Sequence, residues 1–304
     1  ARLRTRPIQK YLKNSDERTD SMAIELKGAP VAAAINERSQ AELHRLLESG
    51  ISPTLAIVRV GEREDDIAYE NGASKRCEKV GVAVRNVVLP ENITQNDLTH
   101  KIEELNADKS VHGVLIFMPL QKQLDGEAVR RTLSPEKDVD GITDGSLAGV
   151  FTGSKIGFSP CTAQACIEIL DHYGIDCKGK RAVVIGRSLV VGKPAAMLLI
   201  AKHATVTVCH TRTVDMPSIT RDAEILIVAA GKAKVIGDEY FSENQVVVDV
   251  GINFADGVMC GDVDFSAANR IVSAITPVPG GVGTVTTSFL VNHVIEAAKR
   301  QNCR

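Results

Sequence analysis

The apolar residues of this chain follow two alternating patterns. Short runs rich in aliphatic residues, which are typical of buried parallel strands, occur at 55–60, 82–89 and 112–117. Segments with helical spacing of apolar residues separate these runs at 68–80 and 95–106, and Thr94 is placed to cap the second helix. A further helical pattern covers 22–49. The strand and helix order predicts a parallel sheet with right-handed crossovers, and therefore an α/β domain.

The same alternation returns after a break. Segment 138–159 is rich in Gly, Thr, Ser and Asp and interrupts the periodicity, so we interpret it as the junction between domains. A helix at 161–173 follows it, and the last helix covers 286–300. The strands predicted between these helices lie at 182–185, 204–208, 224–229, 245–250 and 271–274. This pattern predicts a doubly wound, Rossmann-type sheet.

The length of 304 residues accommodates two domains. We assign 22–159 together with 286–304 to an N-terminal α/β catalytic domain, and 160–285 to the Rossmann domain. Ligands of open α/β sheets bind at the carboxyl ends of the strands, so a two-lobed protein with its active site in the cleft between the domains is expected. Residues 1–21 have little apolar content and are interpreted as an extension, either disordered or non-native.

The composition indicates which classes of binding partner the chain lacks. The chain is 44% hydrophobic and 24% charged, and its net charge of −2 provides no field that would attract nucleic acid or a membrane surface. No segment approaches the roughly 18 to 20 apolar residues that a membrane helix needs. The seven cysteines contain no C-x-x-C pair, which indicates neither a zinc site nor a disulfide framework. We expect a cytoplasmic enzyme without a metal that acts on a small molecule.

The segment AVVIGRSLVVGKPAAMLL at 182–199 carries the nucleotide-binding signal. An aliphatic strand breaks at a turn that contains Gly186, Ser188 and Gly192, and a helix opens near Lys193. Glycines in such a turn allow the backbone to approach a pyrophosphate, and the helix N-terminus binds the anion. Because Ser188 replaces the second glycine of the common G-x-G-x-x-G pattern, the turn alone is weak evidence.

The end of the next strand distinguishes between the two nicotinamide cofactors. It reads Cys209-His210-Thr211-Arg212-Thr213, where an acidic residue would bind the ribose 2′-hydroxyl of NAD. That acidic residue is missing, and Arg187, Thr211 and Arg212 instead suit a 2′-phosphate. The sequence therefore favours NADP, with Gly186, Arg187, Ser188 and Gly192 as the first candidates for cofactor binding and Thr211 and Arg212 as the second.

A set of motifs in fixed order links the chain to a known family. They are KDVDG at 137–141, PCT at 160–162, VIGRSLVVGKP at 184–194, ATVTVCHTRT at 204–213, DVGIN at 249–253, GDVDF at 261–265 and TPVPGGVG at 276–283. Residues 22–299 resemble the methylenetetrahydrofolate dehydrogenase/cyclohydrolase family. The resemblance implies a homodimer of one-carbon metabolism that binds tetrahydrofolate derivatives beside NADP. It would oxidise 5,10-methylenetetrahydrofolate to 5,10-methenyltetrahydrofolate, which many members hydrolyse to 10-formyltetrahydrofolate.

The resemblance also implies residue roles. Tyr69 would stack on the folate ring system, and Asp140 would accept hydrogen bonds from the pterin amino and ring N–H groups, for which a carboxylate is a suitable acceptor. We expect these two residues to be the catalytic pair. Pro279 and Gly280 would border the aminobenzoate, and Gly280 and Gly281 allow close approach of the backbone to a ligand. The nicotinamide pocket would be lined by Ile252 and Thr276.

Two polar residues of the family pattern are absent. Members with both activities carry Y-x-x-x-K and V-Q-L-P-L-P motifs, but here Ala73 stands four residues after Tyr69 and Phe117 takes the place of the glutamine. Lys75 lies about 200° around the helix from position 73. Hydride transfer needs only alignment of donor and cofactor, whereas hydrolysis needs a positioned acid or base. We therefore expect the dehydrogenase to persist and the cyclohydrolase to be weak or absent.

Three alternatives remain open. The chain would keep both activities if Lys75 or a water network replaced the missing lysine. It would be a regulatory folate- and nucleotide-binding protein if catalysis were lost altogether. It would be a Rossmann dehydrogenase for an amino acid or hydroxy acid if the resemblance did not extend to the substrate.

Overall fold

The structure is a computed structural model that describes residues 22–255 and 257–302. It divides into two compact units. The six-stranded unit holds the described residues up to 32 together with 162–286, and the three-stranded unit holds 33–161 together with the residues from 287 onward. Helices α2 (Gly28–Glu48) and α11 (Val282–Asn302) each contribute residues to both units. The predicted extension 1–21 lies outside the described residues.

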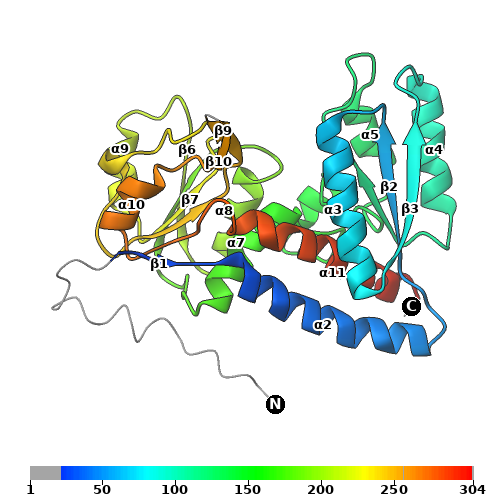
Figure 1. The fold of residues 1–304 in the computed structure, drawn as a ribbon, viewed down its shortest axis with the longest axis horizontal. Coiled ribbons are helices and arrows are strands. Elements are labelled where there is room, and N and C mark those ends of the chain that lie inside the picture. Colours follow the sequence, from blue (N-terminus) through cyan, green and yellow to red (C-terminus); the bar gives the residue numbers. More distant parts are fainter. Residues whose placement is uncertain (1–21, 256, 303–304) are drawn as a thin grey trace. The chain divides into compact units, whose positions relative to one another are not determined.

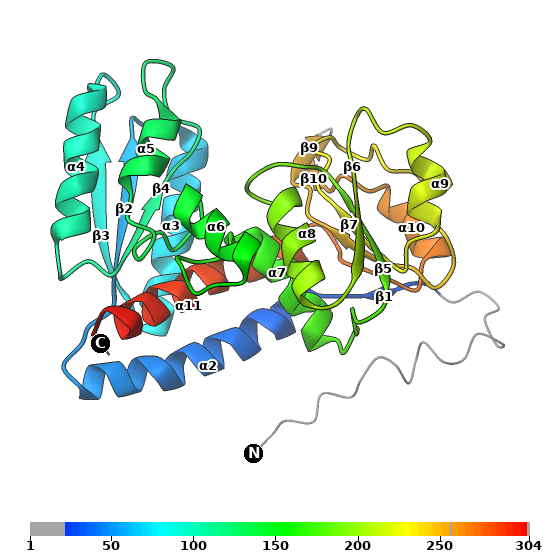
Figure 2. The same ribbon diagram turned by 180° about the vertical axis from the view of Figure 1, so that it is seen from behind.

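The three-stranded unit contains a parallel sheet in the order β3-β2-β4. Its strands are β2 (Thr54–Val60), β3 (Ala83–Leu89) and β4 (Gly113–Ile116). Its helices are α3 (Glu64–Val80), α4 (Gln95–Ala107), α5 (Gly126–Thr132) and α6 (Asp144–Thr152). Figures 1 and 2, seen from opposite sides, show α3 on one face of this sheet and α5 on the other.

Alternation along β2 explains this arrangement, because successive side chains of a strand point to opposite faces. Ala56, Val58 and Val60 join the apolar core that α4 and α5 cover. Arg59 points to the other face, where it contacts α3. Thr94 caps α4 by accepting a hydrogen bond from the Asp97 amide at 3.2 Å, as its place in the sequence predicts.

The six-stranded unit contains a parallel sheet in the order β1-β11-β8-β7-β5-β6. These strands are β1 (Ile24–Glu25), β5 (Arg181–Ile185), β6 (Thr205–Cys209), β7 (Ile225–Val228), β8 (Val246–Asp249) and β11 (Ala274–Ile275). Its helices are α7 (Cys161–His172), α8 (Gly192–Ala201), α9 (Met216–Arg221), the 3-10 helix η2 (Asp238–Tyr240) and α10 (Phe265–Ile271). The α/β class and the Rossmann-type sheet are confirmed.

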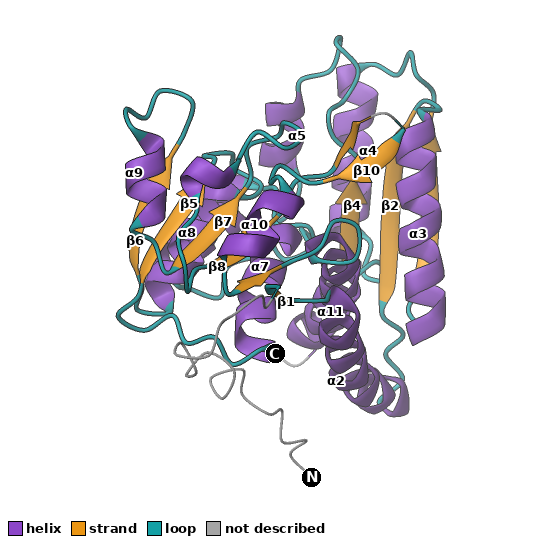
Figure 3. Ribbon diagram, turned by 60° about the vertical axis from the view of Figure 1, so that its left-hand side comes forward, coloured by secondary structure: helices purple, strands orange, loops and turns teal. Residues whose placement is uncertain are grey.

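The chain reverses its direction across this sheet between β5 and β7. From β5 it moves outward to β6, and it then returns past β5 to β7. Helices α9 and α10 pack against one apolar face of the sheet, and α8 lies on the opposite face (Figure 3). Such a reversal is the place where nucleotides bind in doubly wound sheets.

Several short elements differ from the sequence prediction. Residues 24–25 form β1, which pairs with β11, although a helix was predicted from residue 22. This pairing groups residues 22–32 with the six-stranded unit, whereas the sequence prediction placed them in the N-terminal domain. A hairpin of β9 (Asn253–Ala255) and β10 (Val258–Cys260) follows β8 and was not predicted. Within 22–255 and 257–302, no helix is long and apolar enough to cross a membrane.

Candidate functional site

The turn after β5 is shaped by two glycines that leave no room for a side chain. Gly186 has φ +119°, and a Cβ atom there would lie 2.3 Å from the carbonyl oxygen of Ala229 at the end of β7. A Cβ atom on Gly192 would lie 2.2 Å from the Gly186 carbonyl oxygen. The Val191 amide donates to Ser188 Oγ at 3.1 Å, which closes the turn just before α8 begins. Arg187 and Ser188 are exposed.

A second turn lies next to the first. β6 pairs with β5, and the Gly186 amide donates to the Cys209 carbonyl at 2.8 Å. Beyond Cys209, the His210 amide donates to Thr213 Oγ1 and the Arg212 amide donates to His210 Nδ1 at 3.1 Å. His210 therefore stabilises the turn. The other two predicted residues of this turn, Thr211 and Arg212, are exposed.

Two buried carboxylates, which sequence reasoning missed, hold the loops at the carboxyl ends of β7 and β8. Asp249 accepts amide hydrogen bonds from Gly251, Asp262 and Val263 at 2.9 to 3.1 Å. Asp262 accepts from the amides of Gly231 and Lys232 and from Asn253 Nδ2 at 2.8 to 3.0 Å. Burial raises the pKa of Asp249 to about 6, although the amide hydrogen bonds oppose this shift. The motifs DVGIN and GDVDF contain both residues and were the available signal.

The two predicted nicotinamide residues occupy different environments. Thr276 is fully buried, and its hydroxyl accepts a hydrogen bond from the Asp249 amide at 2.7 Å. Thr276 therefore stabilises the backbone at the end of β8. Ile252 is 61% exposed and lies near Gly283, where a Cβ atom would approach its Cδ1 to 3.5 Å.

The loop between β11 and α11 is fastened to the start of α2. The Gly28 amide donates to the Gly280 carbonyl at 2.7 Å, and Gly280 has φ +104°. Pro279 and Gly280 are exposed. Gly281 is buried, and a Cβ atom there would lie 2.5 Å from the Pro277 carbonyl oxygen. Pro279 and Gly280 are thus accessible to a ligand, whereas the tight packing at position 281 requires a glycine.

In the three-stranded unit, the structure brings Tyr69, Phe117 and Asp140 together. The rings of Tyr69 and Phe117 meet edge to face, with centroids 5.6 Å apart. Burial, followed by the charge of Asp140, raises the pKa of Tyr69, so its hydroxyl stays protonated at neutral pH. Ala73 is fully buried. Lys75 is exposed, so its ammonium group does not occupy the position of the missing lysine.

Asp140 interacts with the Cys161 thiol, and a buried imidazole contacts the residue that precedes it. Burial, followed by the charge of Asp138, raises the pKa of Asp140 to about 7, and a hydrogen bond from the Cys161 thiol opposes this shift. His293 Nδ1 lies 2.8 Å from the Val139 carbonyl oxygen, which can only accept, so Nδ1 carries the proton. Burial lowers the pKa of His293 to about 4. This imidazole is therefore neutral and fixes the peptide that precedes Asp140.

Asp138 has a separate role in the same motif. It is fully buried and accepts amide hydrogen bonds from Gly141, Ile142 and Thr143 at 2.7 to 3.0 Å. These bonds close the turn between α5 and α6. Asp140 is left as the carboxylate of KDVDG that is not committed to the turn.

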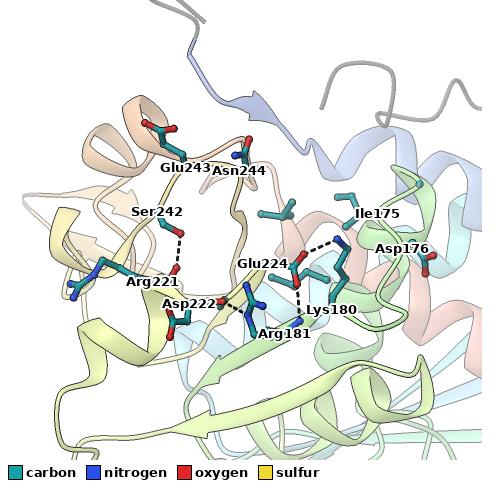
Figure 4. Close-up of a pocket in the computed structure, with 14 residues that line it drawn as sticks. Ile175, Asp176, Lys180, Arg181, Arg221, Asp222, Glu224, Ser242, Glu243 and Asn244 are labelled. Carbon is teal, nitrogen blue, oxygen red and sulfur yellow. Dashed lines mark hydrogen bonds and ion pairs between the residues drawn. The ribbon is translucent and has the colours of Figure 1, made fainter. Parts of the chain in front are cut away.

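A cavity of about 440 Å³ lies away from all of these groups, at the amino ends of β5, β7 and β8. Figure 4 shows interactions that join Glu224 to Lys180 and Arg181. Lys180 Nζ lies 2.7 Å from Glu224 Oε1, and Arg181 Nε donates to the Asp222 carbonyl at 2.7 Å. Nucleotides bind at the opposite edge of such sheets. None of the predicted site residues lines this cavity.

A glycine-lined turn at the reversal of a doubly wound sheet defines a nucleotide-binding domain of the dehydrogenase type. Comparison with family models identifies both parts of the chain. The model described as tetrahydrofolate dehydrogenase/cyclohydrolase, catalytic domain, matches residues 26–140, and the NAD(P)-binding domain of the same family matches 160–302. The chain belongs to the tetrahydrofolate dehydrogenase/cyclohydrolase family.

Individual relatives agree with this assignment. The bifunctional protein FolD of Clostridioides difficile is 48% identical over 278 residues, covering 91% of this chain and 97% of that protein. The crystal structure of the bifunctional enzyme FolD from Campylobacter jejuni has a TM-score of 0.89 at 38% identity and covers 91% and 99% of the two chains. That of Trypanosoma brucei methylenetetrahydrofolate dehydrogenase-cyclohydrolase, complexed with NADP and an inhibitor, has a TM-score of 0.87 at 33% identity, with 92% and 99% covered.

Proposed function

We propose that this chain oxidises 5,10-methylenetetrahydrofolate with NADP and also hydrolyses the methenyl product to 10-formyltetrahydrofolate. The observation that carries the first activity is the space reserved around Gly186 and Gly192, which a Cβ atom would fill. Such a turn fits a dinucleotide pyrophosphate, whose anion the start of α8 would hold. NADP supplies the hydride acceptor when it is bound.

The preference for NADP over NAD rests on the turn after β6. Thr211 and Arg212 are exposed beside the glycine turn, and residues 209–213 contain no carboxylate. A cation and a hydroxyl are suitable partners for a 2′-phosphate, whereas NAD enzymes place an acidic residue there. The complex of the T. brucei relative with NADP supports the same choice.

Residues of the three-stranded unit would bind the folate. Tyr69 keeps 38% of its surface exposed, so its ring is available for stacking on a heterocycle. Asp140 would accept hydrogen bonds from the pterin edge, and His293 would hold it in place through the Val139 peptide. From the six-stranded unit, the exposed residues Pro279 and Gly280 would border the aminobenzoate, as the family resemblance implies.

The second activity is favoured by the relatives. The C. difficile and C. jejuni proteins are both named bifunctional, which supports the alternative of two activities over the expected loss of hydrolysis. Ala73 and Phe117 nevertheless occupy the positions of the usual lysine and glutamine, and the exposed Lys75 does not replace the lysine. If hydrolysis persists, other polar groups of this chain must serve it.

Two assays on the purified full chain test the proposal. NADP reduction with 5,10-methylenetetrahydrofolate and hydrolysis of 5,10-methenyltetrahydrofolate should both proceed well above their rates without protein. Arg212→Ala should raise KM for NADP about tenfold, equivalent to about 1.4 kcal/mol, and leave KM for NAD unchanged, with Arg221→Ala as a control on α9. Absence of NADP reduction would refute the dehydrogenase, and an equal effect on both cofactors would refute the role of Arg212.

The homodimer is also a proposal, which sedimentation of the purified chain tests directly. A monomer at the concentrations of the assays would contradict it.

A further inference from the structure

We propose that the ion pair of Arg59 and Glu70 serves the hydrolytic step in place of the absent lysine and glutamine. This inference rests on the proposed second activity, because the pair has this role only if the chain hydrolyses methenyltetrahydrofolate. It is carried by three observations on the three-stranded unit: the burial of the pair, its position next to Phe117, and its position one helical turn from Ala73.

The pair is nearly buried and incompletely hydrogen-bonded. Arg59 Nε lies 2.6 Å from Glu70 Oε2, and each side chain is 11% exposed. Arg59 Nη1 donates to the Gly61 carbonyl. Within the described part of the chain, Arg59 Nη2 and Glu70 Oε1 make no hydrogen bond. The Nη2 amino group and the Oε1 oxygen are therefore left for a ligand or water at the carboxyl end of β2, which is the edge where ligands bind.

Strand register places Arg59 beside the position of the missing glutamine. Val58 of β2 pairs with Ile116 of β4, and the Phe117 amide donates to the Val58 carbonyl at 3.2 Å. The next residues along the two strands are Arg59 and Phe117. Val58 and Ile116 both face the core under α4, so Arg59 and Phe117 both face α3. Their contacts with Glu70 and Tyr69 of α3 agree with this.

Helix geometry places Glu70 beside the position of the missing lysine. The buried residues of α3 form one stripe that includes Glu70 and Ala73, three residues apart. Helical side chains point toward the N-terminus of their helix, over the preceding turn. A lysine at position 73 would therefore extend toward the turn that contains Glu70. The pair thus supplies a cation and a carboxylate in the region that the two lost polar side chains would occupy.

The chemistry of the step requires a base and then an acid. In the first half, the water oxygen bonds to the methenyl carbon, its proton passes to the Glu70 carboxylate, and the electron pair of the C=N bond neutralises the cationic nitrogen. In the second half, Glu70 returns the proton to N5 as the bond from the carbon to N5 breaks. The hydroxyl proton leaves to solvent, and the carbonyl of 10-formyltetrahydrofolate forms. Arg59 acts as a positioning residue that holds the carboxylate through Nε.

Fold stability alone does not require this pair. A buried ion pair is commonly no better for stability than apolar residues of similar volume, since both charges lose their hydration. Leu55 and Ile57, on the same face of β2, are already apolar. Arg59→Leu together with Glu70→Leu should therefore give a folded protein, which separates a structural role of the pair from a chemical one.

The experiment compares both reactions of the full chain across matched variants. Glu70→Gln and the double Arg59→Leu/Glu70→Leu variant should lower the hydrolysis rate about 100-fold, the effect of losing a general base, and leave NADP reduction within about twofold. Arg59→Lys should retain more hydrolysis than Arg59→Leu, because an ammonium group still holds the carboxylate. The control is Arg85→Leu, which removes an ion pair with Asp108 from β3 and should change neither rate.

The outcomes separate the two proposals. Unchanged hydrolysis in Glu70→Gln and in the double variant, with NADP reduction intact, would overturn the role of the pair and leave both activities standing. Wild-type protein that reduces NADP but does not hydrolyse the methenyl compound would overturn the second activity and the role of the pair together. Failure of NADP reduction in the wild type would count against the proposed function itself.

Discussion

Asp140 has a proposed role in folate binding, and its buried carboxyl group lowers the free energy of unfolding at neutral pH. The Asp140→Asn variant tests the two effects separately. Burial raises the pKa of this carboxyl to about 7, far above its unfolded value of about 3.9. Between these two pH values, the carboxyl group is therefore protonated in the folded protein and ionised in the unfolded chain. Stability falls as pH rises from about 4 to about 7, and the loss is complete above that range.

The size of the effect follows from the shift. A difference of about three pKa units corresponds to a ceiling of about 4 kcal/mol. Asp140 is only half-buried, so solvent screens part of this energy and we expect about 2 kcal/mol. The side-chain amide of the Asp140→Asn variant is neutral at every pH. The variant should gain about 1 kcal/mol of unfolding free energy over the wild type between pH 5 and pH 8, while its activity on the folate substrate falls.

Urea unfolding of both proteins at pH 5 and pH 8 measures this difference, with KM for methylenetetrahydrofolate as the activity readout. The matched control is Asp138→Asn in the same motif, which loses an acceptor for three amide groups and should be less stable at both pH values. An Asp140→Asn variant whose stability relative to the wild type did not change with pH would refute the reasoning.

Two further predictions concern the six-stranded unit. Gly186→Ala places a Cβ atom 2.3 Å from the Ala229 carbonyl oxygen at φ +119°; we expect a loss of about 2 to 3 kcal/mol and no rise in thermal midpoint with NADP, and a normal NADP response would contradict this. Asp262→Asn leaves one N–H donor facing an amide group, and we expect it to lower the free energy of unfolding by about 1 to 3 kcal/mol and to raise KM for NADP. The control is Asp264→Asn: Asp264 caps α10, and asparagine is an equally good cap, so this variant should resemble the wild type.

The sequence predicted the larger elements because their periodicity is strong and their ends carry clear signals. The stripe of α4 behind Thr94 is an example, and the aliphatic run of β5 before Gly186 is another. The short elements were missed for a physical reason. β1 has two residues and exists because β11 offers an unpaired edge, which no local pattern records. The β9–β10 hairpin depends in the same way on Asp262, which binds Asn253 from nine residues away.

The features of the candidate site also differ in whether the sequence alone reveals them. Backbone requirements, such as the glycines at 186 and 192, are visible in a single sequence because only one residue type fits. Side-chain pairs are not visible, since their partners come from different elements. Arg59 read alone is a charged residue in a strand, and Glu70 is a carboxylate on a helix. Only the register of β2 with β4 and the face of α3 show that they meet.

This division bears on how one activity can change without the other. The space that fits the cofactor is built from backbone atoms and glycines of the six-stranded unit, so substitutions on α3 leave it intact. The polar groups proposed for hydrolysis all lie on one stripe of α3 and its facing strands. Ala73 and Phe117 remove one polar pair there, and Arg59 with Glu70 supplies another. Because both pairs offer a cation and an acceptor at one sheet edge, the chemistry can persist although the residues that perform it have moved.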